Sequence, residues 1–295
     1  MRTAALTLGI TPQNVVLFHH FRRFLECASK KAIDVAPLKG AHLLTSVYPD
    51  GEDRGLLADV DFLVRPADWK EALSILREMG FRGRPATRRP VSDAEYHETA
   101  YYLEIDGGDR IMFEPHRFLA PPARLRIDYA ALWQRSTVSE FDGAPCRRLS
   151  NDDHFLHTVV HMVSHSFLAP SRSLRDMALL IDRGGVSLDR VIAEVDVWGI
   201  RNASWLALSM LEEQLPGTVD ARYLRSVRPA ARVRRYLRWL VPSPSGFRLP
   251  KLGLRGQQLV LWPALFDSAR HYFSYTGYYA RLRIRDAVAW RSGHW

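Results

Sequence analysis

The chain has 295 residues and a net charge of +9, with 47% hydrophobic and 25% charged residues. These proportions are those of an ordinary folded protein, so disorder, collagen and coiled coil are excluded for the chain as a whole. The sequence contains no apolar run of the ~20 residues that cross a bilayer, and two cysteines are too few for a disulfide scaffold. Because the first residues lack the apolar core of a signal peptide, we expect a cytoplasmic protein.

Hydrophobic spacing and turn residues predict alternating helices and strands in the first half of the chain. The predicted elements are, in chain order, a helix beginning at Pro12, a strand over 34–38, a helix over 41–47, a strand over 59–64, a helix over 66–79, and a hairpin with strands at 101–105 and 110–114. From Ser150 to about Leu240 the pattern is helical almost without interruption. Residues 1–149 are therefore predicted to form an α/β domain, 150–240 a helical domain and 241–295 an extension.

Charge is distributed unevenly along the chain. After residue 220 there are fourteen arginines and Lys251 against Asp267 and Asp286, a net charge of +13, so the rest of the chain carries −4. Tyrosines, phenylalanines and tryptophans are interleaved with these arginines. The mixture suits single-stranded nucleic acid or an anionic membrane surface, and equally a helical subdomain with solvated arginines.

Asp59 and Asp61 are the strongest chemical signal. Residues two apart in a strand point to the same face, and neighbouring carboxylates repel each other unless a cation lies between them. Such oxygen ligands suit Mg²⁺, whose remaining ligands are commonly water and substrate phosphate. The alternative is a solvent-facing acidic pair at the end of a strand.

Lys39 and Gly40 lie where a predicted strand meets a predicted helix. Free backbone N–H groups and the helix dipole at such a junction can bind a phosphate. Arg54, in the turn-rich segment before the Asp pair, could reach the same phosphate. The alternatives are an ordinary turn and a surface charge.

A third carboxylate would complete a two-metal site, in which the ions activate an attacking hydroxyl and stabilise a leaving pyrophosphate. Glu114, at the end of a predicted strand, is favoured over Glu104 in the same hairpin. His116 lies two residues beyond Glu114 and could share its face.

Together these motifs resemble those of a known family. Leu38-Lys39-Gly40, Arg54, the block from Asp59 to Val64, and Glu114-Pro115-His116 are similar to the motifs of the uncharacterised nucleotidyltransferases of the DNA polymerase β-like superfamily. The resemblance implies an α+β fold, in which a small mixed β-sheet with flanking helices is followed by an all-helical domain. It also implies that Asp59, Asp61 and Glu114 bind metal and that Lys39 and Gly40 border the nucleotide phosphates. One departure is Gly40-Ala41, where the wider superfamily often has Gly-Ser and thus a hydroxyl contact.

A histidine-rich stretch follows in the helical half. His157, His161 and His165 are spaced four residues apart and share a helix face, with His154 adjacent. Metal binding, a position lining the active site, and plain packing are all compatible with this spacing.

Two functions are compatible with these features. The first is a Mg²⁺- or Mn²⁺-dependent nucleotidyltransferase that moves a nucleoside monophosphate, expected to be AMP from ATP, onto an unidentified acceptor. Its catalytic residues would be Asp59, Asp61 and Glu114, with Lys39, Gly40, Arg54 and His116 contacting the nucleotide. The second is a catalytically degenerate binding module of the same fold that docks an anionic partner, a membrane surface or nucleic acid, through residues 221–295. In that case a peripheral membrane location is the alternative to a purely cytoplasmic one.

Overall fold

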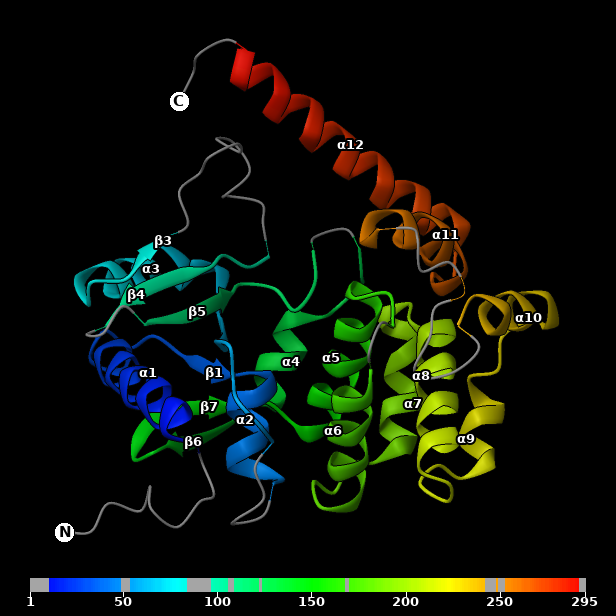
Figure 1. Ribbon diagram of the computed structural model, residues 1–295, viewed down its shortest axis with the longest axis horizontal. Helices are drawn as coiled ribbons and strands as arrows, with labels where there is room; N and C mark the ends of the chain where they lie inside the picture. The colour runs from blue at the N-terminus through cyan, green and yellow to red at the C-terminus, as the bar shows by residue number, and fades with distance from the viewer. Residues whose placement is uncertain are drawn as a thin grey trace. The chain divides into compact units, whose positions relative to one another are not determined.

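The computed structural model describes residues 11–48, 54–83, 97–105, 109–121, 124–167, 170–241, 248 and 253–291. The chain forms two compact units, shown in Figure 1. The first unit comprises residues 1–122, 129–150 and 282–295, and the second comprises 123–128 and 151–281.

A mixed five-stranded sheet forms the centre of the first unit, in the order β1-β2-β5-β4-β3. β2 and β5 are parallel, whereas β1 pairs with β2, β5 with β4 and β4 with β3 in antiparallel fashion. A separate antiparallel hairpin is formed by β6 and β7. The strands are β1 (Val35–Pro37), β2 (Val60–Val64), β3 (Arg82–Gly83), β4 (Tyr101–Glu104), β5 (Arg110–His116), β6 (Thr137–Phe141) and β7 (Ala144–Arg148).

Helices flank this sheet, as Figure 1 shows for α1 and α3. They are α1 (Pro12–Lys30), α2 (Lys39–Ser46), the 3₁₀ helix η2 (Pro66–Asp68), α3 (Trp69–Glu78) and α4 (Tyr129–Arg135). α1 begins as the sequence predicts, because the hydroxyl of Thr11 accepts a hydrogen bond from the backbone N–H of Asn14 at 3.3 Å.

Aromatic rings join α1 to one face of the sheet. The ring of Phe21 on α1 lies 5.4 Å from Phe62 on β2, 5.8 Å from Phe113 on β5 and 5.0 Å from Phe141 on β6, between centroids. Since side chains alternate along a strand, Asp61, the neighbour of Phe62, points to the face of the sheet opposite α1. The packing of the core thus determines on which face the acidic residues lie.

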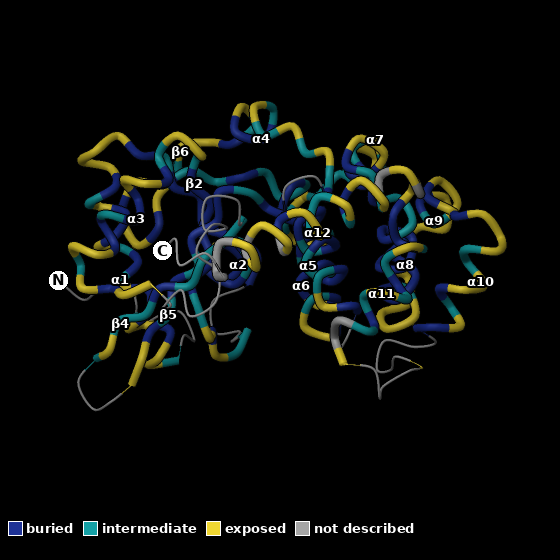
Figure 2. The backbone as a smooth tube through the Cα atoms, turned by 90° about the horizontal axis from the view of Figure 1, so that it is seen from above, coloured by how far each residue is buried: buried dark blue, intermediate teal, exposed yellow. Residues whose placement is uncertain are grey.

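The second unit is entirely helical in its described part. Its helices are α5 (Asn151–Ser164), α6 (Ser171–Asp182), α7 (Leu188–Trp198), α8 (Arg201–Gln214), α9 (Ala221–Ser226), α10 (Ala231–Leu240), α11 (Leu254–Leu265) and the greater part of α12 (Ala269–Arg291). α5 and α8 are the most buried of these, as their largely dark colour in Figure 2 shows, and in the first unit every residue of β2 is buried.

The predicted fold class is confirmed, as is the helical character of 150–240, and the predicted strands match to within a residue or two. β2 begins at Val60, so Asp59 immediately precedes the strand, and α2 begins at Lys39, two residues earlier than expected. β3, α4 and the β6–β7 hairpin are not among the elements that the sequence predicts. Residues 49–53 and 106–108 of the predicted turns lie outside the described residues.

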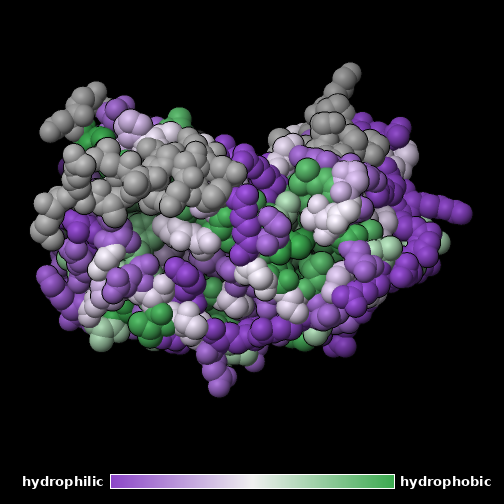
Figure 3. Space-filling view, turned by 90° about the horizontal axis from the view of Figure 1, so that it is seen from below, coloured by the Kyte–Doolittle hydropathy of each residue, from purple (hydrophilic) through white to green (hydrophobic). Residues whose placement is uncertain are grey.

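No described helix is both long enough and apolar enough to cross a membrane. On the face drawn in Figure 3, hydrophilic residues predominate, with hydrophobic patches among them.

Candidate functional site

Parallel pairing of β2 and β5 brings two predicted acidic residues together. Asp61 is the register partner of Glu114, and paired residues in neighbouring strands project on the same side of a sheet. Glu104, the rival candidate, pairs with Arg110 at the other end of β5 and is exposed. The sheet therefore places Glu114, and not Glu104, beside Asp61.

Two basic side chains contact the Asp61 carboxylate. Lys39 Nζ donates a hydrogen bond to Asp61 Oδ1 at 2.7 Å, and His116 Nε2 lies 2.9 Å from the same oxygen. The main chain reinforces this arrangement, because the N–H of Leu38 donates to the carbonyl oxygen of Asp61 at 2.9 Å. Lys39 also has a left-handed backbone, with φ of +43°, which costs about 1–2 kcal/mol for a residue with a side chain.

A further carboxylate, Glu98, lies in this cluster and was missed by the sequence analysis. Its Oε2 is 3.4 Å from Nδ1 of His116 and 3.2 Å from Nε2 of His97. Glu98 lies outside any regular strand and reaches β5 through an isolated antiparallel bridge to His116. No local sequence pattern predicts that Glu98 lies in this cluster, because its position depends on backbone pairing with His116, later in the chain. We call Asp59, Asp61, Glu98 and Glu114 the acid site.

The four carboxyl groups of the acid site have pKa values that diverge. Burial and the charge of Asp61 raise the pKa of Asp59 to about 6, and burial together with Asp61 and Asp59 raises the pKa of Glu114 to about 7. Burial also opposes ionisation of Asp61, but Lys39 and His116 outweigh it and hold the Asp61 pKa well below its usual range. Lys39 and His116 thus stabilise one carboxylate while its neighbours remain easy to protonate.

Glu98 and Lys39 have pKa values shifted in favour of their charged forms. Burial opposes ionisation of Glu98, but the hydrogen bond from His97 and the charge of His116 outweigh it, so the Glu98 pKa falls well below its usual range. Burial likewise opposes the charged form of Lys39, yet Asp61 raises the Lys39 pKa well above its usual range. The site therefore contains a fixed ion pair, Lys39 with Asp61, and a second ionised carboxylate.

Gly40 and Arg54 are brought together at the start of α2. A Cβ atom on Gly40 would lie 2.7 Å from Nη1 of Arg54 and 2.4 Å from Cδ2 of Leu57, closer than real contacts allow. A side chain at this position would displace the flexible ends of Arg54 and Leu57, which lie against the start of α2. The predicted trio of Lys39, Gly40 and Arg54 therefore lies in one place, next to Asp61.

Among the described residues, one group of three side chains has the geometry to hold a metal ion. The ligand atoms of Asp61, Glu114 and His116 all lie within 4.8 Å of one another. Their chemistry fits a divalent cation, because carboxylate and imidazole groups are common ligands of such ions. Asp59 is not a member of this group, so its predicted role as a ligand stays a prediction.

The histidine face of α5 shows no such clustering in the described part of the chain. His154 and His157 are buried, whereas His165 lies beyond the helix end and is exposed, with its ring 4.4 Å from that of His161. This partition between core and surface favours packing for His154 and His157.

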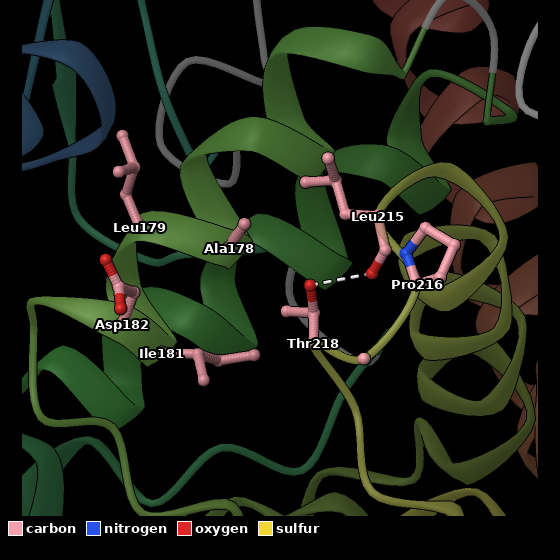
Figure 4. A pocket seen from close by; sticks show the side chains of 8 residues that line it. Ala178, Leu179, Ile181, Asp182, Leu215, Pro216 and Thr218 are labelled. Carbon is pink, nitrogen blue, oxygen red and sulfur yellow. Dashed lines mark hydrogen bonds between the residues drawn. The ribbon is translucent and has the colours of Figure 1, made fainter.

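The second unit contains an open cavity of about 580 Å³. It is lined by residues of α6 and by the loop after α8, where the hydroxyl of Thr218 donates to the carbonyl oxygen of Leu215 at 2.7 Å (Figure 4). Asp182 is its single carboxylate and no basic side chain lines it. With so few polar groups, the cavity is a weaker candidate for chemistry than the acid site.

A family model described as uncharacterised nucleotidyltransferase matches residues 4–216, whereas no curated protein matches the chain significantly. One similar solved structure is an antigenic nucleotidyltransferase-like protein from Paracoccidioides brasiliensis. It is 16% identical, with 71% of this chain and 92% of that chain covered and a TM-score of 0.44. Because the family model spans most of its length, the chain belongs to the family of uncharacterised nucleotidyltransferases.

Proposed function

We propose that the protein is a Mg²⁺-dependent nucleotidyltransferase that moves AMP from ATP onto an acceptor hydroxyl or phosphate. The observation that carries this proposal is the convergence of Asp61, Glu114 and His116 ligand atoms within 4.8 Å, in a chain of a nucleotidyltransferase family. The identity of the acceptor is not part of the proposal.

In this proposal the carboxylates of Asp61 and Glu114, with Asp59 beside them, hold the divalent ion. A bound Mg²⁺ would supply charge that polarises the transferred phosphoryl group and stabilises the leaving pyrophosphate. Asp61 is suited to this task because Lys39 and His116 keep it ionised.

The nucleotide phosphates would lie at the start of α2. There, the backbone N–H groups and helix dipole favour an anion, and the Arg54 side chain reaches Gly40. Lys39 would add a third positive group to the same place, since its ammonium is already held beside Asp61. These groups support the predicted contacts of Lys39, Gly40 and Arg54 with the nucleotide.

Transfer requires a base for the acceptor proton. The acceptor oxygen forms a bond to the α-phosphorus, the bond from that phosphorus to the bridging oxygen of the β-phosphate breaks, and pyrophosphate leaves. The acceptor proton passes to a carboxylate of the acid site. In this proposal Asp59 or Glu114 accepts the proton, because both carboxylates lie beside Asp61 in the acid site.

A second candidate function, a binding module, is favoured by a surface of the helical unit. On α10, Arg232, Arg235, Tyr236 and Trp239 are exposed, and we call them the arginine surface. The rings of Tyr236 and Trp239 stack with centroids 6.1 Å apart, and the guanidinium of Arg248 lies 5.7 Å from the Trp239 ring. Such exposed rings and arginines suit an anionic partner, either nucleic acid or a membrane surface.

The test is pyrophosphate release from labelled NTPs and Mg²⁺ in the presence of pools of candidate acceptors. We expect Asp61→Asn and Asp59→Asn each to reduce release by at least ~100-fold, because each removes charge stabilisation from the transition state. MgATP should raise the melting temperature of the parent but not of either variant. The matched control is Glu104→Gln, which changes an exposed carboxyl of the β4–β5 hairpin and should behave as the parent.

Equal stabilisation of all four proteins by MgATP would refute the site assignment. Nucleotide binding without any pyrophosphate release, from every acceptor pool, would favour the binding module.

A further inference from the structure

The His116 ring lies between two carboxylates, one at each nitrogen. Nε2 is 2.9 Å from Asp61 Oδ1, and Nδ1 is 3.4 Å from Glu98 Oε2. The residue is only 1% exposed, so its ring has little freedom to turn away. Nε2 faces Asp61, and His116 offers a ring nitrogen within 4.8 Å of carboxylate oxygens of Asp61 and Glu114.

This arrangement matches that of metal-binding histidines in general. A ligating histidine commonly binds the ion with one nitrogen and donates the N–H of the other to a carboxylate, which fixes the tautomer and the ring orientation. Glu98 is suited to accept that hydrogen bond, because its Oε2 lies 3.4 Å from Nδ1 of His116.

The main chain holds Glu98 in this position. The N–H of Thr99 donates to the carbonyl oxygen of Pro115 at 3.2 Å, and the N–H of Arg117 donates to that of His97 at 2.8 Å. Hydrogen bonds on both sides of Glu98 thus attach this segment to the end of β5, the strand that carries His116. The carboxylate and the imidazole are therefore fixed relative to each other by backbone pairing.

We propose that His116 Nε2 is a direct ligand of the divalent ion, and that Glu98 is a positioning residue that holds the ring through Nδ1–H. This inference rests on the proposed function, since it concerns the ion of the same site. It replaces an all-oxygen ligand set by two carboxylates and one imidazole.

The nitrogen ligand has a consequence for metal choice. Mg²⁺ is a hard cation that prefers oxygen ligands, whereas imidazole suits transition ions and carboxylate suits Mn²⁺ as well as Mg²⁺. A mixed set of this kind favours Mn²⁺. We expect the ion-free protein to bind Mn²⁺ roughly 10-fold or more tightly than Mg²⁺.

The experiment uses the full chain, stripped of metal and titrated with Mn²⁺, with the free ion followed by electron paramagnetic resonance. Pulsed measurements on the bound ion should show coupling to one ¹⁴N nucleus. In His116→Asn this coupling should disappear and the preference for Mn²⁺ over Mg²⁺ should shrink. His19→Asn, which changes an exposed histidine of α1, is the matched control and should keep both.

Glu98 is tested by a pair of variants. Glu98→Ala removes the acceptor at Nδ1 and should weaken Mn²⁺ binding by roughly 10-fold or more, the range typical of groups that support a ligand. Glu98→Gln retains an acceptor oxygen and should recover most of that affinity. A merely structural role would lower the melting temperature of Glu98→Ala without changing the ¹⁴N coupling or the affinity of the folded protein.

The outcomes separate this inference from the proposed function. Bound Mn²⁺ with no ¹⁴N coupling, or a coupling that survives in His116→Asn, overturns the inference and leaves the proposed transfer intact. If neither Mn²⁺ nor Mg²⁺ binds the parent, with or without ATP, both proposals fail.

Discussion

Like charges have different consequences in the acid site, where they are close together at the sheet, and on the arginine surface, where they are exposed. In the acid site, four carboxyl groups approach one another at the sheet, and two of them have pKa values raised to about 6 and about 7. On the arginine surface, Arg232 and Arg235 are exposed on α10. Water and salt screen exposed charges, so like charges are tolerated there. When like charges are buried, the same repulsion shifts their pKa values and favours the binding of a cation between them.

This comparison predicts that removing the Lys39 cation, which contacts the buried Asp61 carboxylate, lowers stability far more than removing an exposed cation. Lys39→Met leaves the Asp61 carboxylate without its closest positive partner. Because an uncompensated buried charge is costly, we expect a loss of about 2–4 kcal/mol of unfolding free energy at neutral pH. Urea denaturation measures it, with Lys70→Met on the exposed face of α3 as the matched control.

The sign of the pH dependence sharpens that test. The pKa of Asp61 is depressed in the folded state, so its contribution to stability is present above its unfolded pKa and lost as pH falls. The difference between parent and Lys39→Met should therefore shrink below about pH 4. A loss no larger than that of Lys70→Met would show that the acid site behaves like exposed surface.

Glu114 should have a smaller effect of opposite sign. Its folded pKa of about 7 exceeds the ordinary 4.5, so the ion-free folded protein holds a proton that the unfolded chain releases. Stability should fall as pH rises from about 4.5 to 7, and Glu114→Gln removes this loss. At pH 7.5 we expect the variant to be about 1–2 kcal/mol more stable than the parent.

Melting the two proteins in a chelator across pH 4.5–8 measures this difference, with Glu104→Gln as the control. If the difference in stability between the parent and Glu114→Gln stays constant over that pH range, the pKa of Glu114 is not raised.

The smallest effect is expected on the arginine surface. Arg235→Gln removes an exposed charge, so its unfolding free energy should change by less than about 0.5 kcal/mol. Its binding to anionic vesicles or RNA should weaken a few-fold and lose part of its salt dependence. Trp239→Ser should reduce the vesicle binding that persists at high salt, because this salt-resistant part of the binding comes from the aromatic ring.

Point substitutions are preferable to removing the chain after residue 241. Leu261 and Leu265 of α11 are buried, and Trp262 donates a hydrogen bond to Val163 of α5. Truncation would therefore expose the core of the helical unit. If Arg235→Gln and Trp239→Ser bind both vesicles and RNA as well as the parent, this surface is not a docking surface.

The sequence predicted the parts of the fold and site that depend on local patterns. The hydrophobic run around Asp61 predicted a strand there, and Glu114 and His116 were identified because they are two residues apart at the end of another predicted strand, which is β5. The contact of Lys39 with Asp61 was not foreseen, since sequence placed Lys39 near phosphates without indicating how its side chain turns.

Glu98 illustrates the limit of local reasoning. Neither its spacing nor its neighbours distinguish it from an exposed glutamate, and its position beside His116 comes from backbone pairing with β5. The hairpin β6–β7 was missed for a related reason. Val138 and Phe141, the apolar residues of β6, are three positions apart and so lie on opposite faces of the strand, which leaves no hydrophobic pattern with a period of two.

The parallel pairing of β2 with β5 also affects the order in which the protein folds. Asp61 and Glu114 come from distant parts of the sequence and meet only when these strands join, and such non-local contacts form at a high entropic cost. The repulsion between the two carboxylates is therefore absent from the early, locally structured chain. Where such contacts form after the transition state, relieving them changes the unfolding rate and leaves the folding rate nearly constant. Glu114→Gln should accordingly lengthen the lifetime of the folded chain without making it fold faster.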